Sequence, residues 1–232
     1  MIKFKNSEIT PENIYKKRRS FIKSIGLGAS TLAMSAIPFV NKSLASERDK
    51  LTSYKDITTY NNYYEFGTSK SDPYRNSQIF KTTPWDIAIE GEVEKPIKLS
   101  MEEISEMFIS EERIYRLRCV EGWSMVIPWM GFSLSKLLSK VNPTNKAKFV
   151  EFESVYDPAQ MKGQRYPVLN WPYNEGLRID EAMHPLTTVV TGLYGKKLPN
   201  QNGAPLRIFI PWKYGFKSAK AIVKIKFVEN MP

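Results

Sequence analysis

Few residues of this chain could carry out chemistry, because its 232 residues include one cysteine, Cys119, and one histidine, His184. A single cysteine excludes an internal disulfide, a Cys-x-x-Cys redox pair and a cysteine-based zinc finger within one chain. A metal site would therefore use Cys119, His184, carboxylates or ligands supplied from outside the chain.

Cys119 follows two arginines, Arg116 and Arg118, in the segment RLRCVEGW. Two guanidinium groups close in sequence favour the thiolate, a soft ligand that suits soft or high-valent metals better than magnesium or calcium. The alternative is a small buried apolar side chain, which is the role of most free cysteines. The segment alone leaves both interpretations open.

Three other segments were candidates for chemistry. His184 is accompanied by no Gly-x-Ser-x-Gly pattern, so a structural or surface histidine is favoured over a serine triad. The segment 192–197 (GLYGKK) lacks the spacing and the Ser/Thr of a phosphate loop and predicts a turn. The segment 201–220 places Arg207 in a strand, with three lysines around the glycine that follows it. That pattern is typical of anion binding, and a solvated basic loop is the alternative.

Alternating apolar residues predict the strands that position these groups. The expected strands cover residues 85–90, 114–120, 150–154, 206–210 and 221–227. Ser100 and Glu103 form a capping-box pattern that predicts a helix, and Ser133 is expected to cap a second, short helix. Strands and helices do not alternate regularly, which favours the α+β class over a doubly wound parallel sheet.

The positive charge of the chain is concentrated at its N-terminus. Residues 1–45 contain eight Lys/Arg and two Glu, so the rest of the chain carries only +4 of the net +10. A basic body that binds nucleic acid is therefore not supported. The segment 16–23 (KKRRSFIK) precedes about sixteen mostly apolar residues, fewer than the roughly twenty that span a bilayer. With the small residues at 43–45, this pattern predicts a cleaved signal peptide of the twin-arginine type.

Three motifs together resemble one known family. They are 61–67 (NNYYEFG), 116–125 (RLRCVEGWSM), and the pair 202–205 (NGAP) and 212–217 (WKYGFK). The chain resembles the catalytic subunits of periplasmic protein-methionine-sulfoxide reductases, which are molybdopterin enzymes with a sulfite-oxidase-like, mixed-sheet α+β fold. The resemblance implies a signal peptide at 1–45, an arm at 46–82 that contributes to the cofactor site, and a molybdopterin-binding oxidoreductase domain at 83–232. Family members continue beyond Val228, so the chain is expected to lack their C-terminal extension.

The resemblance also implies a set of site residues. Cys119 falls on the position whose thiolate binds molybdenum in molybdenum-molybdopterin, a cofactor without an attached nucleotide. Glu121 is a candidate proton donor or substrate-orienting group, with an ion pair to Arg116 or Arg118 as the favoured alternative. Ser154 stands where the family usually has threonine, and Ser218 where it has glycine. The implied cofactor-binding residues are Asn61, Tyr64, Glu65, Cys119, Ser154, Asn202, Arg207, Ser218, Ala219 and Lys220.

The implied function is transfer of an oxygen atom from methionine sulfoxide in periplasmic proteins to reduced molybdenum. The chain has neither a pair of histidines for haem nor cysteines for an iron–sulfur cluster. The resemblance therefore implies that electrons come from the quinone pool through a membrane haem subunit, after export of the folded protein to the periplasm by the twin-arginine machinery. The alternatives are a sulfite-oxidase-type molybdoenzyme and a non-catalytic molybdopterin-binding module. Glu121 argues against sulfite, because a carboxylate repels a dianion.

Overall fold

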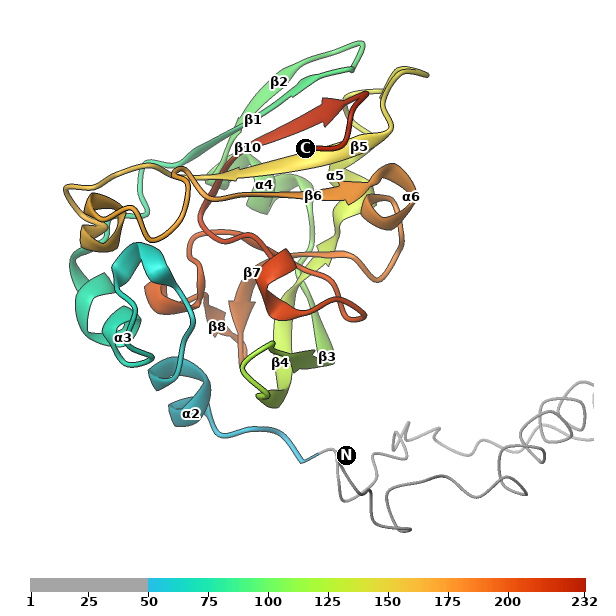
Figure 1. Ribbon diagram of the computed structural model, residues 1–232. Helices are drawn as coiled ribbons and strands as arrows, with labels where there is room; N and C mark the ends of the chain where they lie inside the picture. Colours follow the sequence, from blue (N-terminus) through green and yellow to red (C-terminus); the bar gives the residue numbers. More distant parts are fainter. Residues whose placement is uncertain (1–49) are drawn as a thin grey trace, which may run out of the picture. The chain divides into compact units, whose positions relative to one another are not determined.

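The computed structural model describes residues 50–232 (Figure 1). The predicted signal peptide at 1–45 and the first residues of the predicted arm lie outside the described residues. Within the described part, no helix is both long enough and apolar enough to cross a membrane.

Two five-stranded sheets form the body of the described chain. The strands of the first sheet follow the order β2 (Ile97–Ser100), β1 (Asp86–Gly91), β10 (Ile222–Val228), β5 (Phe149–Ser154) and β6 (Asn174–Arg178). β1 and β10 are parallel and the other neighbours are antiparallel, which makes this a mixed sheet.

The second sheet is antiparallel and carries the cysteine at one of its ends. Its strands are β3 (Glu111–Arg118), β4 (Ser124–Ser133), β7 (Thr188–Leu193) and β8 (Lys196–Lys197), with β9 (Arg207–Phe209) also paired to β7. Cys119 comes directly after β3, in the turn that leads to β4.

The helices are short. The α-helices are α2 (Tyr54–Thr59), α3 (Asp72–Asn76), α4 (Met101–Met107), α5 (Leu134–Leu138) and α6 (Ile179–Ala182). Short 3-10 helices are η3 (Tyr64–Phe66), η4 (Ser77–Ile79), η5 (Lys162–Arg165), η6 (Asn200–Asn202) and η7 (Gly215–Lys217). The predicted capping box is confirmed, because Ser100 accepts from the N–H of Glu103 and Glu103 accepts from the N–H of Ser100.

Three local predictions need correction. The strand expected at 114–120 begins earlier, at Glu111, and ends at Arg118. Ser133 precedes α5, but its side chain makes no capping hydrogen bond to that helix. In β10 the alternation is interrupted: Ile222 pairs with Ser154 and Lys224 with Glu153, so the residue between Ile222 and Lys224 is the extra one of a β-bulge.

The apolar side chains form two clusters. The larger one packs the first sheet against α4 and α5, and Ile87, Phe152 and Ile225 lie fully inside it. The smaller one includes Ile57 of α2, Trp129 of β4 and Phe209 of β9. Burying these faces supplies most of the stability that holds the ends of the strands in place.

The segment 50–82, here called the arm, is tied to the body by hydrogen bonds and close backbone contact. Asn200 donates from Nδ2 to the carbonyls of Ser77 and Phe80, at 2.8 and 2.9 Å. Gly163 of η5 lies so close to η3 that a Cβ built on it would be 1.9 Å from the carbonyl oxygen of Tyr64. No side chain fits there unless the arm moves.

We expect Gly163→Ala to displace the arm and to lower the free energy of unfolding by about 1–3 kcal/mol, as overpacking does. Gly215→Ala is the matched control, because its Cβ would meet Leu117 at 3.5 Å, an ordinary contact. That variant should change the free energy of unfolding by less than about 1 kcal/mol. Urea unfolding of both variants measures the difference, and equal effects would show that the close approach at Gly163 does not constrain the arm.

Candidate active site

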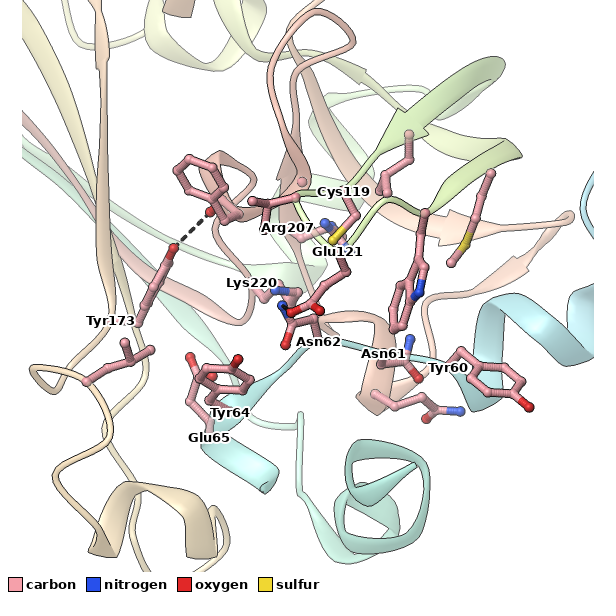
Figure 2. A pocket seen from close by; sticks show the side chains of 18 residues that line it. Tyr60, Asn61, Asn62, Tyr64, Glu65, Cys119, Glu121, Tyr173, Arg207 and Lys220 are labelled. Carbon is pink, nitrogen blue, oxygen red and sulfur yellow. Dashed lines mark hydrogen bonds between the residues drawn. The ribbon is translucent and has the colours of Figure 1, made fainter. Parts of the chain in front are cut away.

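A pocket of about 300 Å³ opens where the arm, the β3–β4 turn and the segment 201–220 meet (Figure 2). Its wall contains Asn61, Tyr64, Glu65, Cys119, Glu121, Arg207 and Lys220 among the residues implied by the sequence. Ser154, Asn202, Ser218 and Ala219 are buried and do not line it. Seven of the predicted positions from three distant segments therefore face one cavity.

The turn after β3 presents the thiol of Cys119 to this pocket. The N–H of Cys119 donates to the carbonyl of Trp123 at 2.9 Å, and the N–H of Gly122 donates to the carbonyl of Cys119 at 3.0 Å. Gly122 has a φ of 80°, a conformation that glycine adopts without strain. The tight turn holds the cysteine at the end of the sheet, and its sulfur lies among the labelled side chains of Figure 2.

Two cations lie at the base of the site. Arg207 is 4% exposed, and burial lowers its pKa to about 10. Lys220 keeps partial exposure, but desolvation of its ammonium group lowers the pKa to about 8. Among residues 50–232, no carboxylate oxygen lies within ion-pair distance of either side chain. Desolvated cations without a direct ion pair are costly, so this arrangement favours an anionic ligand.

Arg207 is held by backbone carbonyls and by an aromatic ring. Nη1 donates to the carbonyl of Asn202 at 2.9 Å, and the guanidinium carbon lies 5.1 Å from the ring of Trp129. These contacts orient the planar group, but they do not neutralise its charge. An anion bound in the pocket would provide the guanidinium group of Arg207 with a charged partner.

The arm brings a carboxyl group to the same place. Glu65 is 4% exposed, and burial raises its pKa, while the nearby charge of Lys220 acts in the opposite direction. The ammonium group of Lys220 lies 4.9 Å from the centre of the Tyr63 ring. Burial also raises the pKa of the Tyr63 hydroxyl, and the charge of Glu65 adds to this effect.

Several buried polar atoms around the pocket have no hydrogen-bond partner within the described chain. They are Asn61 Oδ1, Tyr63 OH, Ser154 Oγ, Asn202 Oδ1 and Ser218 Oγ. Buried polar groups are normally paired, and Asn61 is the residue of this set that lines the pocket, so its orphaned oxygen indicates a polar ligand there. Ser218 has a φ of −95°, so the position does not require glycine.

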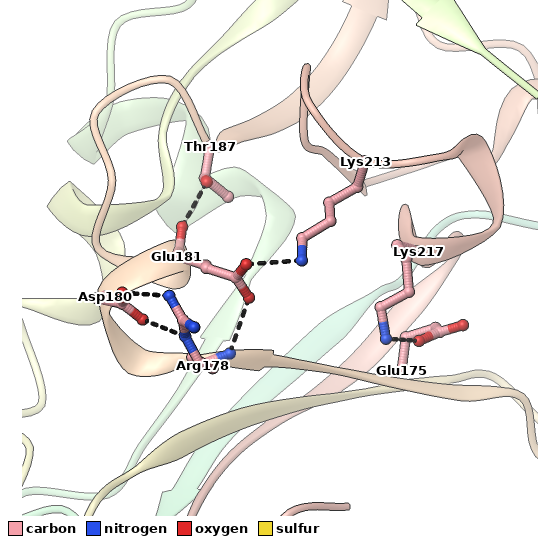
Figure 3. A network of polar contacts seen from close by, with 7 residues as sticks. All are labelled: Glu175, Arg178, Asp180, Glu181, Thr187, Lys213 and Lys217. Carbon is pink, nitrogen blue, oxygen red and sulfur yellow. Dashed lines mark hydrogen bonds and ion pairs between the residues drawn. The ribbon is translucent and has the colours of Figure 1, made fainter.

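Two of the three lysines in the segment 201–220 do not face the pocket. Figure 3 shows Lys213 paired with Glu181, at 2.6 Å, and Lys217 paired with Glu175. Of the lysines in the segment that the sequence associated with anion binding, these two are therefore paired with carboxylates of the chain itself. The acidic partners come from β6 and α6, far away in sequence, and only Lys220 contributes its charge to the pocket.

At the mouth of the pocket, Glu121 is paired with a residue that the sequence analysis missed. Lys70 of the arm lies 2.9 Å from Glu121 Oε1, whereas an arginine of β3 was the expected partner. The amides of the adjacent residues Asn61 and Asn62 have different partners. Asn61 donates from Nδ2 to the carbonyl of Ile57, and the Oδ1 of Asn62 accepts from Lys70. Lys70 belongs to no recognisable pattern, and only the folded arm reveals its position.

His184 lies outside the pocket, as expected for a surface residue. Its Nδ1 accepts from the N–H of Leu186 at 3.2 Å, and its ring meets Trp212 edge-on with the centroids 4.6 Å apart. Within the described chain, no three His, Cys, Asp or Glu side chains are grouped as metal ligands. A metal bound through Cys119 would therefore take its other ligands from a cofactor.

Comparison with known proteins agrees with this geometry. A profile of the family described as the oxidoreductase molybdopterin binding domain matches residues 75–232. The protein-methionine-sulfoxide reductase catalytic subunit MsrP of Xanthomonas axonopodis pv. citri is 52% identical, over 98% of this chain and 74% of its own length. The subunit of the same name from Burkholderia mallei is 50% identical, over 97% of this chain and 73% of its own.

A solved structure shows the same fold at low identity. The sulfane dehydrogenase SoxCD from Paracoccus pantotrophus is similar with a TM-score of 0.56 and 14% identity, over 90% of this chain and 59% of that one. At this identity the likeness shows the fold alone. With the family match, it confirms the predicted sulfite-oxidase-like α+β fold.

The lowered pKa of Lys220 predicts how stability depends on pH. Between pH 8 and the ordinary value of 10.5, the unfolded chain holds a proton on Lys220 that the folded chain has lost. The contribution of this group therefore makes the free energy of unfolding rise with pH across that window. The free energy of unfolding of the cofactor-free protein is compared with that of Lys220→Met at each pH. The difference should shift in favour of the unsubstituted protein by up to about 2 kcal/mol between pH 7.5 and 10.5, after allowing for the partial exposure of Lys220.

Urea unfolding at several pH values measures this difference. Lys98→Met is the control, because Lys98 is 69% exposed in its ion pair with Asp86. A difference between the protein and Lys220→Met that stays constant with pH would show that the ammonium group of Lys220 is well solvated.

Proposed function

The chain belongs to the molybdopterin-binding oxidoreductase family that includes the catalytic subunits of protein-methionine-sulfoxide reductases, and we propose that it reduces methionine sulfoxide in proteins. One observation carries the proposal: the only thiol of the chain faces a pocket that also holds two desolvated cations without carboxylate partners. Neither a buried structural cysteine nor a solvated basic loop accounts for that combination.

The residues present fit a molybdenum-pterin cofactor. Cys119 would hold the metal, and Arg207 and Lys220 would face the phosphate of the pterin. The orphaned Oδ1 of Asn61, which lines the pocket, would pair with the polar edge of the pterin. We infer the form without a nucleotide, in which this phosphate ends the cofactor. When bound, the group supplies the two-electron redox change and the acceptor for the oxygen atom.

The wall near Cys119 suits the side chain of an oxidised methionine. Leu117, Trp123 and Met125 line one side of the pocket and offer apolar contact to methylene and methyl groups. Asn62 lines the mouth beside Glu121 and offers an amide donor to the sulfoxide oxygen. A sulfoxide is neutral, so it tolerates the carboxylate of Glu121 better than a sulfite dianion does.

Reduction of a sulfoxide to a thioether and water consumes two electrons and two protons. The chain cannot relay electrons by itself, because one histidine and one cysteine cannot hold a haem with two histidines or an iron–sulfur cluster. We infer an external donor, a membrane haem subunit fed by quinol. The leader sequence KKRRSFIK supports export of the folded protein to the periplasm by the twin-arginine machinery, with oxidised periplasmic proteins as substrates.

We expect Cys119→Ser to lose molybdenum and to lower sulfoxide reduction by at least about 100-fold, because a hard hydroxyl replaces the soft thiolate. The wild-type protein matured in the cytoplasm should contain about one molybdenum per chain. Metal analysis and activity with a reduced viologen as donor measure both effects. Full activity in Cys119→Ser would contradict the assignment of the thiolate.

A substrate panel separates this function from its alternatives. The wild-type protein should reduce free methionine sulfoxide and an oxidised protein, and should leave sulfite unoxidised. Sulfite oxidation without sulfoxide reduction would favour the sulfite-oxidase type, and a molybdenum-loaded protein inactive on every substrate would favour a storage module.

A further inference from the structure

Three side chains form a polar cluster at the pocket mouth, here called the rim cluster: Asn62, Lys70 and Glu121. Lys70 Nζ donates to Asn62 Oδ1 at 3.1 Å and to Glu121 Oε1 at 2.9 Å. Asn62 Nδ2 donates to the same Glu121 oxygen at 3.5 Å, a weak contact. Asn62 and Glu121 line the pocket, whereas Lys70 lies behind them and is not part of its wall.

Lys70 is itself fixed in place. Its ammonium group lies 5.4 Å from the centre of the Tyr64 ring and 6.0 Å from that of Trp123, within the range of cation–π attraction. Its carbonyl accepts from the N–H of Asn61 at 3.0 Å. Burial acts against the charge of Lys70, but the hydrogen bond to Glu121 leaves its pKa above the ordinary value. Lys70 therefore remains a donor at neutral pH.

This arrangement determines which end of the Asn62 amide is available. An amide carries an acceptor oxygen on one side and two N–H donors on the other. Because the ammonium group of Lys70 only donates, it attracts Oδ1 and leaves the N–H groups of Asn62 on the side of Glu121, which lines the pocket. Without Lys70, the amide could rotate and place its oxygen there.

A sulfoxide oxygen is an acceptor and has no proton to donate. It binds well where an N–H group meets it and poorly where a carbonyl or carboxylate oxygen meets it. Glu121 supplies acceptor oxygens at the mouth, and the amide of Asn62 is a donor beside them. The orientation of that amide therefore changes how well this part of the wall binds a sulfoxide oxygen.

We propose that Lys70 is a positioning residue for the substrate, which orients the amide of Asn62 so that an N–H group meets the sulfoxide oxygen. The proposal rests on the proposed function and assigns a specificity role to a residue outside the pocket wall. A Lys70 that only fastened the arm to the β3–β4 turn would affect substrate affinity equally with and without the amide of Asn62.

The test compares Lys70→Met, Lys70→Gln and Lys70→Arg in the molybdenum-loaded protein. Lys70→Met should raise KM for methionine sulfoxide about tenfold and change kcat by less than about threefold, as expected when substrate binding is lost. Lys70→Gln, which keeps a donor without the charge, should fall between Lys70→Met and the wild-type protein, and Lys70→Arg should restore most of the affinity. Calorimetric titration with methionine sulfoxide in the absence of reductant should give the same order of Kd values.

A double-mutant cycle tests whether Lys70 acts through Asn62. In the Asn62→Ala background, Lys70→Met should raise KM by less than about twofold, because no amide remains to be oriented. Lys98→Met, which breaks the exposed ion pair with Asp86, is the matched control and should leave KM and kcat unchanged. Molybdenum content and the thermal midpoint of each variant show that it is folded and loaded.

Three results would overturn the inference: a wild-type KM and Kd in Lys70→Met, an equal effect of Lys70→Met with and without Asn62, or loss of affinity in Lys70→Arg as large as in Lys70→Met. If the wild-type protein reduces methionine sulfoxide and one of these is found, only the role of Lys70 fails. If the loaded wild-type protein does not reduce methionine sulfoxide at all, the proposed function fails and the inference fails with it.

Discussion

The desolvation of two cations beside the only thiol is the constraint on which the rest of the site depends. Arg207 is anchored by backbone carbonyls and the Trp129 ring, and Lys220 lies against the Tyr63 ring. Removing such charges from water costs several kcal/mol each when no anion compensates them. The fold maintains this charge because two packed sheets and the arm surround it. The site is therefore preorganised for an anion before any ligand arrives.

Preorganisation requires the arm to be held as firmly as the sheets. The arm carries Tyr64, Glu65 and Asn62 but contributes no strand to either sheet. It is fastened by the contact at Gly163, by the amide of Asn200 and by the ion pair between Lys70 and Glu121. These contacts lie beside pocket residues, so the packing of the arm determines where the pocket residues meet a ligand. A loosened arm would open the wall opposite Cys119.

The sequence was informative where the determinant is local. The capping box at Ser100 and the alternation in β1 depend on neighbouring residues, and both predictions agree with the structure. The sequence could not predict which lysines face the pocket. Lys213 pairs with an acid of α6 and Lys217 with an acid of β6, and only these tertiary contacts distinguish them from Lys220.

The candidate site shows the same division. The arginines before Cys119 made a thiolate ligand one of two open interpretations, and the resemblance supplied that role and the other positions. Lys70 has no such signal, since its importance comes from a contact 51 residues away. The bulge in β10 likewise depends on pairing with β5 and not on its own residues.

The place of β10 in the first sheet has a consequence for biosynthesis. β10 lies between β1 and β5, although it is the last strand of the described chain to leave the ribosome. Trp85 hydrogen-bonds the carbonyl of Ile222 across 137 residues. Neither the central pairing nor the wall that carries Lys220 can form during translation of the earlier strands. A ligand that contacts Lys220 can therefore enter a finished pocket only after the segment through β10 has been synthesised.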